Sequence, residues 1–231
     1  MPGGLPRCWT ISTHLPDDDR NLRAGPRFVE AWAHGWAVVR GTPPPVRDSG
    51  ALRIDVGLPE QKARYMFSRC SEDVRRLAER INEPHVLIKI CSPPEPVRAL
   101  LPPRWVIQQQ GYLMARMLEP PKNPQLPAGY QFTVEPDPPR LKVSIVDPRG
   151  EPAARGGSAI VEGLAIFDQI RTDEPHRRRG LARAVMTVLQ GVAFRQGVRQ
   201  GGLVATPDAR ALYDSMGWQL HSLYTRVEIP A

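Results

Sequence analysis

The chain has 231 residues, 41% of them hydrophobic, so it can form one large domain or two small ones with an ordinary packed core. Its formal net charge of +7 is compatible with nucleic acid, a membrane surface or an anionic cofactor as partner. The apolar runs are too short to cross a membrane, no signal peptide is recognisable, and the basic residues carry no zinc-finger or RNA-binding signature. We therefore expect a cytoplasmic protein that binds neither membrane nor nucleic acid.

The cysteines and histidines form no recognisable disulfide or metal pattern. Cys8, Cys70 and Cys91 are odd in number and widely spaced, which argues against a disulfide framework or a zinc site. The five histidines lack metal-ligand spacing, and no Ser or Cys nucleophile motif is present. The sequence thus predicts reduced cysteines, no bound metal and no covalent acyl-enzyme.

The first half of the chain alternates between strand-like and helix-like patterns. Residues 1–26 are polar with several Pro and Gly, which predicts an irregular lead-in, and residues 27–119 are expected to form an N-terminal α/β domain. The predicted strands are 35–40, 51–56, 85–91 and 105–118, and the predicted helices are 72–81 and 95–101. We expect the first two strands to pair as a hairpin.

The second half begins after a proline-rich break. Residues 120–127, PPKNPQLP, interrupt any regular element and are the predicted linker to a C-terminal domain, 128–231. The predicted strands of this domain are 130–134, 141–146, 159–172, 201–206 and 218–229, and its predicted helices are 181–197 and 207–217. This order predicts an α/β fold with a mixed central sheet and helices on its faces.

A basic, glycine-containing turn joins the predicted strand 159–172 to the helix that follows it. The small residues Gly180 and Ala182 let a ligand approach the backbone, and the first turn of a helix presents unpaired N–H groups. The pattern therefore predicts a site for a di- or triphosphate-like group, although a solvated basic turn is the simpler alternative. The residues expected to contact the ligand are Arg177, Arg178, Arg179, Gly180, Leu181 and Ala182.

Neither a Walker loop nor a dinucleotide-binding GxGxxG pattern fits this turn. Instead, Arg177-x-x-Gly180-x-Ala182 resembles the (Q/R)-x-x-G-x-(G/A) pyrophosphate loop of the GNAT superfamily of acetyl-CoA-dependent N-acetyltransferases. A second signature of that family, a helix with A-x-x-L-Y that ends in G-F or G-W, is also similar. The matching residues are Ala209, Leu212, Tyr213, Gly217 and Trp218.

The resemblance covers about the last hundred residues and implies a GNAT-type mixed sheet flanked by helices. It implies that acetyl-CoA is the acyl donor and that the backbone of Ile170 and Thr172 contacts its pantetheine arm. Thr206 stands where the family commonly has Asn, and its hydroxyl is the implied contact there. The N-terminal half would be either a degenerate GNAT-like repeat or a family-specific domain that shapes the acceptor pocket.

Acetyl transfer to an amine needs a base and a proton donor. A lysine-type amine costs roughly 4 to 5 kcal/mol to deprotonate at pH 7, so a base matters for such an acceptor. Asp168 is the first candidate for the base or for a water-linked relay, and Glu162 is the alternative; each could instead be a solvated carboxylate or an ion-pair partner. Tyr213 matches the family tyrosine that protonates the leaving thiolate, although a pocket-wall aromatic is the alternative role.

The expected function is N-acetyl transfer from acetyl-CoA to a primary amine of a small molecule or peptide by direct attack in a ternary complex. The alternatives are a catalytically silent acyl-CoA sensor or scaffold and an enzyme with a longer acyl donor. Amino acids, polyamines, antibiotics and protein N-termini all stay open as acceptors. The strand 218–229 could pair at a sheet edge, which allows a homodimer.

Overall fold

The computed structural model describes residues 25–231, so most of the predicted lead-in lies outside the described part. The helices are α1 Pro26–Arg40, α2 Glu72–Arg80, α3 Pro94–Arg98, α4 Leu181–Arg195 and α5 Pro207–Asp214. The strands are β1 Val46–Asp48, β2 Ala51–Leu58, β3 Gln61–Phe67, β4 Val86–Ile90, β5 Val106–Ile107, β6 Gly111–Met117, β7 Gln131–Asp137, β8 Arg140–Val146, β9 Pro152–Val161, β10 Leu164–Thr172, β11 Gln200–Ala205 and β12 Gln219–Glu228.

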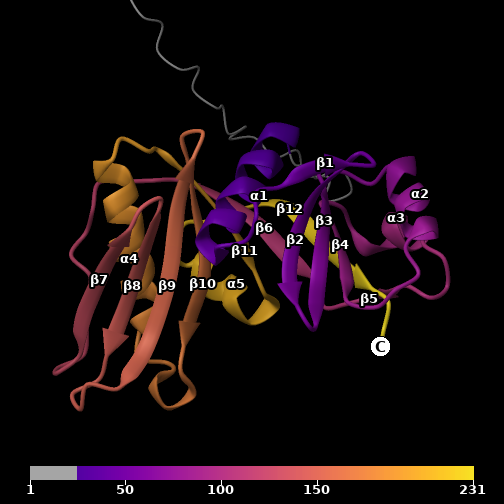
Figure 1. The fold of residues 1–231 in the computed structure, drawn as a ribbon. Helices are drawn as coiled ribbons and strands as arrows, with labels where there is room; N and C mark the ends of the chain where they lie inside the picture. Colours follow the sequence, from indigo (N-terminus) through magenta and orange to yellow (C-terminus); the bar gives the residue numbers. More distant parts are fainter. Residues whose placement is uncertain (1–24) are drawn as a thin grey trace, which may run out of the picture.

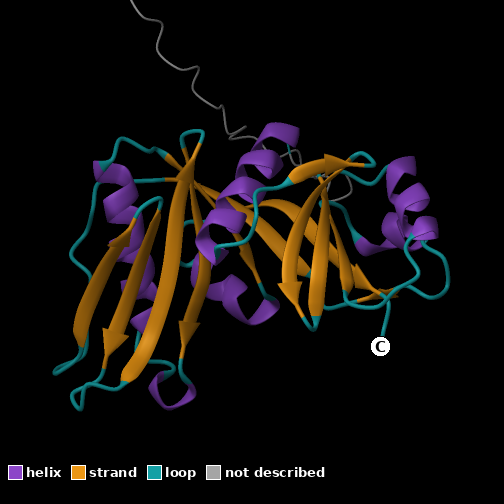
Figure 2. Ribbon diagram, in the orientation of Figure 1, coloured by secondary structure: helices purple, strands orange, loops and turns teal. Residues whose placement is uncertain are grey.

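The strands form one mixed sheet with helices on its faces (Figures 1 and 2). Their order is β1-β2-β3-β4-β12-β6-β11-β10-β9-β8-β7, and β5 pairs with β12. This arrangement confirms the predicted α/β class with a mixed sheet. β6 precedes the proline-rich segment yet lies between β11 and β12, and β12 also pairs with β4. The two halves of the chain therefore exchange strands at the centre of the sheet.

Each half contains a parallel strand pair that is joined through a helix. In the first half β3 and β4 are parallel and α2 connects them, and in the second half β10 and β11 are parallel and α4 connects them. If the two halves were a degenerate repeat, we would expect such similar strand–helix–strand connections in both. The repeat itself and the domain boundaries stay predictions.

Two predicted strands were wrong. Residues 35–40 are the end of α1, because Phe28, Trp32 and Trp36 recur at helical spacing on its buried face and Gly41 closes the helix in the left-handed conformation. β2 instead pairs antiparallel with β1 and with β3, both of which the prediction missed. Residues 159–172 form parts of β9 and β10, and the turn between them carries positive φ angles at Glu162 and Gly163.

The helices cover opposite faces of the sheet and form separate clusters of buried side chains. α4 packs with the β8–β10 side chains that include Val143, Ile145 and Phe167, whereas α1 packs on Ile166 and on β2 and β3 residues such as Ile54. A third cluster, which includes α2 and α3 residues, contains the fully buried Ile88. Alternate residues of β10 therefore contact α1 on one face and α4 on the other, which makes β10 the central strand of the candidate site.

Candidate active site

The two parallel strands of the second half separate partway along their length. β10 pairs with β11 only from Leu164 to Ile166, whose partners are residues 200–202. Beyond that point β11 continues to Ala205 paired with β6, while β10 continues to Thr172 and, among the described strands, pairs with β9 alone. In the first half, by contrast, β3 and β4 stay paired through Phe67 and Ile90. The outer half of β10 thus has a free edge whose backbone groups can pair with an extended ligand.

A β-bulge shapes that free edge. The pairing of β10 with β9 shifts register between Asp168 and Arg171, and Gln169 within the shift has a φ of 58°. Ile170 packs toward the α4 side, and the hydroxyl of Thr172 is buried without a hydrogen-bond partner among residues 25–231. Both residues implied for the pantetheine contact therefore lie on the open part of β10.

The basic turn leads from the end of β10 into α4. Arg178 and Gly180 have positive φ angles of 63° and 79°, and the first helical hydrogen bond runs from Ala184 N to Gly180 O at 3.0 Å. The N–H groups of Leu181 and Ala182 consequently have no carbonyl acceptor in the described chain. No carboxylate of that part forms an ion pair with the exposed residues Arg177, Arg178 and Arg179. The turn has the geometry and the uncompensated charge of an anion site.

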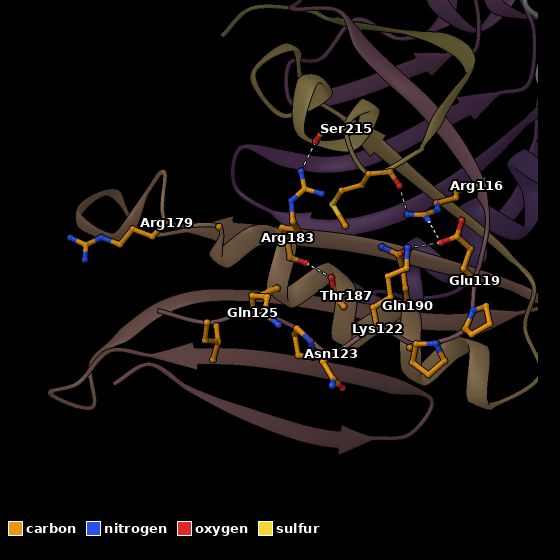
Figure 3. A pocket seen from close by; sticks show the side chains of 18 of the residues that line it. Arg116, Glu119, Lys122, Asn123, Gln125, Arg179, Arg183, Thr187, Gln190 and Ser215 are labelled. Carbon is orange, nitrogen blue, oxygen red and sulfur yellow. Dashed lines mark hydrogen bonds and ion pairs between the residues drawn. The ribbon is translucent and has the colours of Figure 1, made fainter. Parts of the chain in front are cut away.

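A cavity of about 690 Å³ lies beside this turn, between α4 and the segment 119–127 (Figure 3). Arg179 and Gly180 lie at its border with the turn, and Arg183, Thr187 and Gln190 line it from one face of α4. The amide nitrogen of Gln190 is buried without a partner among the described residues. The cavity therefore extends from the basic turn along α4.

Most of the charged side chains that line the cavity are basic. Lys122 and Arg116 both pair with Glu119, at 3.1 and 3.0 Å, and Arg183 donates to the hydroxyl of Ser215 at 2.6 Å (Figure 3). The predicted linker 120–127 has no helix or strand, and it forms one wall. Sequence reasoning missed Arg116, Arg183 and Gln190 because the residues that complete the cavity with them are far away along the chain.

Tyr213 is buried on α5, with 6% of its surface exposed. Its ring packs edge-on to Trp218, with centroids 6.2 Å apart, and Trp218 packs in the same way on Phe167 of β10. Burial raises the pKa of Tyr213, so the phenol keeps its proton at neutral pH. Thr206 directly precedes α5 and is exposed, and its carbonyl accepts the N–H groups of Ala209 and Arg210.

The two carboxylate candidates lie in different places. Asp168 is on β10 beside the bulge and accepts hydrogen bonds from Arg40 of α1, with Nε to Oδ2 at 2.6 Å and Nη2 to Oδ1 at 3.4 Å. Glu162 is exposed on the β9–β10 turn, at the end of β10 opposite to the basic turn. The structure therefore brings Asp168, and not Glu162, to the open part of β10.

These features occur in the part of the chain that matches a family model. Residues 112–218 match the model of the acetyltransferase (GNAT) family. These residues form a GNAT acetyltransferase domain. The GNAT domain contains the open strand β10, the basic turn and Tyr213. The family match therefore places this part of the chain among acyltransferases.

Solved structures show the same fold over most of the chain. A GCN5-related N-acetyltransferase from Kribbella flavida has a TM-score of 0.64 at 16% identity and covers 89% of this chain and 95% of its own. A GNAT-family acetyltransferase from Novosphingobium aromaticivorans has a TM-score of 0.57 at 17% identity over 90% and 100% of the two chains. A tandem GNAT protein from the clavulanic acid pathway has a TM-score of 0.52 at 13% identity over 73% and 75%. No curated protein sequence matches this chain.

Two features are absent from residues 25–231. None of the helices described is long and apolar enough to cross a membrane. Within the same residues no three His, Cys, Asp or Glu side chains are grouped as metal ligands.

Proposed function

We propose that the GNAT domain of this protein transfers the acetyl group of acetyl-CoA to a primary amine by direct attack within a ternary complex. The observation that carries this proposal is the free edge of β10, which leads directly into the basic turn at the start of α4. A ligand with an extended, amide-containing arm and a pyrophosphate fits this site. The free edge of β10 can pair with the arm, and the N–H donors at the start of α4 can bind the pyrophosphate.

In this arrangement the pyrophosphate would lie on the N–H groups of Leu181 and Ala182, with residues 177–179 nearby. The pantetheine amides would pair with the backbone of Ile170 and Thr172. The cavity beside Arg179 and Gly180 has room and positive charge for the nucleotide end of the donor.

The transfer needs two proton movements. The amine nitrogen attacks the thioester carbonyl carbon, the C–N bond forms, and the C–S bond breaks. We assign to Asp168 the acceptance of the amine proton, directly or through water, with Arg40 orienting the carboxylate. Tyr213 would donate its proton to the departing thiolate, which its burial favours because the phenol stays protonated.

A second candidate function is an acetyl-CoA sensor or scaffold without turnover. The observation that favours it is that the Arg40 guanidinium already donates hydrogen bonds to both carboxylate oxygens of Asp168. Such a protein would bind acetyl-CoA through the same turn and would release no thiol with any amine.

Calorimetric titration with acetyl-CoA, followed by a thiol-release assay over a panel of amines, tests the proposal. Gly180→Glu should abolish binding because it adds a negative charge and a side chain at a positive φ, with no other atom within 4 Å of the new Cβ. Gly57→Glu is the matched control, since Gly57 also has a positive φ and open space but lies on β2.

Binding lost only in Gly180→Glu, together with thiol release for some amine, supports the transferase. Binding without release for any amine favours the sensor. Absence of acetyl-CoA binding to the wild-type protein overturns both.

A further inference from the structure

A group of positively charged side chains lies on the α1 face of the sheet, next to Asp168. Lys89 of β4 is the register partner of Met66 and of Arg226, and Met66 packs in the cluster that contains α1. Arg64 lies two residues before Met66 on β3, so its side chain points to the same face. We call Arg40, Arg64, Lys89 and Arg226 the cation cluster.

The cluster is continuous with the proposed catalytic carboxylate. The guanidinium groups of Arg64 and Arg40 lie against the ring of Trp36, at 3.9 and 4.7 Å from its centroid. Arg40 in turn holds Asp168. Lys89 Nζ lies 5.6 Å from the ring centroid of Tyr224, on the neighbouring strand β12.

The positive charge of the cluster is only half compensated. Arg40 pairs with Asp168 at 2.6 Å and Arg226 pairs with Glu228 at 2.5 Å. Arg64, which is only 8% exposed, has no carboxylate partner in residues 25–231, and its polar contact is the side chain of Gln61 at 3.4 Å. Lys89 Nζ has neither an ion pair nor a hydrogen bond within the described chain.

Further hydrogen-bond donors in the same place are also unsatisfied. The hydroxyl of Tyr224, the indole N–H of Trp32 and Nε of Arg226 are buried without a partner in the part of the chain that the structure describes. Buried cations and donors are normally paired, because leaving them unpaired destabilises the protein. Burial and the neighbouring Arg64 and Arg226 accordingly lower the pKa of Lys89 well below its usual range.

We propose that the cation cluster binds an oxyanion, a carboxylate or a phosphate, of the amine acceptor, and that Arg64 and Lys89 are its main contacts. An anion there would supply the missing negative charge and accept from the unsatisfied donors. The amine of the same molecule would then lie toward Asp168 and the open edge of β10. This inference rests on the proposed function and narrows its acceptor to amines that carry a negative group.

Anion binding can be tested without the cofactor. Thermal unfolding is followed with sodium acetate or sodium phosphate at constant ionic strength, for wild type, Lys89→Met and Lys62→Met. Lys62 is the matched control because it is an exposed lysine on β3 that pairs with Glu83 at 3.0 Å. Phosphate could also bind the basic turn, so the readout is the difference between wild type and Lys89→Met.

We expect at least one anion to raise the melting temperature of wild type and Lys62→Met but not of Lys89→Met. Lys89→Arg should retain the shift because it keeps the charge. The anion that acts distinguishes a carboxylate from a phosphate. Equal shifts in wild type and Lys89→Met, or no shift in wild type, would overturn the proposal.

Turnover provides the second readout, with amines matched in pairs: phenylalanine against phenethylamine, and phosphoethanolamine against ethanolamine. The anionic member of one pair should have at least a tenfold higher kcat/KM in wild type, and Lys89→Met should remove that preference. Equal kcat/KM within both pairs contradicts the proposal. If acetyl-CoA binds but no amine releases thiol, the proposed transferase activity is wrong. The anion titration still tests whether the cation cluster binds an anion.

Discussion

The guanidinium of Arg40 holds the carboxylate of Asp168 through Nε and Oδ2 at 2.6 Å, across the boundary between α1 and β10. The two residues are 128 positions apart in the chain. The contact ties the first described helix to the strand that borders the proposed acetyl-transfer site.

If Asp168 accepts the amine proton, Asp168→Asn should lower kcat about 100-fold or more while acetyl-CoA binding is kept. Arg40→Met leaves the carboxylate in place and should lower kcat by less than about tenfold. Steady-state kinetics and calorimetry measure both effects. Arg47→Met removes another α1 ion pair, with Glu30 at 2.7 Å, and serves as the control. Unchanged kcat in Asp168→Asn would limit the pair to a structural role.

Tyr213→Phe removes only the hydroxyl that we assign to thiolate protonation. We expect kcat to fall about 100-fold, with little change in acetyl-CoA affinity, because the ring keeps its packing on Trp218. Tyr130→Phe is an informative comparison, since the Tyr130 hydroxyl contacts His176 Nδ1 at 2.9 Å beside the basic turn. That variant should affect cofactor affinity more than kcat. Full turnover in Tyr213→Phe would exclude Tyr213 from the chemistry.

The partly buried ammonium of Lys89 should make stability depend on pH. Its folded-state pKa lies below the unfolded value, so the unfolded chain binds more protons between the two, and stability rises with pH through that window up to about 10.4. Urea unfolding from pH 7 to 10 should therefore show a steeper rise for wild type than for Lys89→Met. If the stability of wild type and of Lys89→Met rose equally with pH, Lys89 would not be a desolvated cation. The groups that face it are Arg40, Arg64, Cys91, Tyr224, Arg226 and Glu228.

Gly35 lets α1 approach β10 closely. A Cβ there would lie 2.8 Å from Cβ of Ile166, so Gly35→Ala should lower the free energy of unfolding by about 1 to 3 kcal/mol. Gly191→Ala is the matched helical control, because its nearest atom is Cβ of Pro121 at 3.0 Å, on a segment without helix or strand. We expect its stability to stay within about 1 kcal/mol of wild type. Equal losses of unfolding free energy in the two variants would contradict the close approach of α1 to β10.

Local patterns predicted many of the elements. The apolar spacing after Leu181, the glycine at position 197 and the proline at position 207 predicted the two helices that flank β11, and both begin where expected. These signals act over a few residues, so the sequence contains them directly. The prediction failed at 35–40, where Trp36 and Val39 suggested a strand but lie on the buried face of a helix. It also failed at Glu162 and Gly163, because strands on both sides of that turn are buried and the apolar pattern continues across it.

The sequence by itself determined the basic turn, its glycine and the helix that follows, because backbone geometry and the charge of neighbouring residues are local properties. Only the tertiary structure decided that β10 and β11 separate after Ile166, that Arg40 occupies Asp168 and that Arg64 and Lys89 share a face with them. Those relationships depend on strand order and register, which bring together residues far apart in the chain.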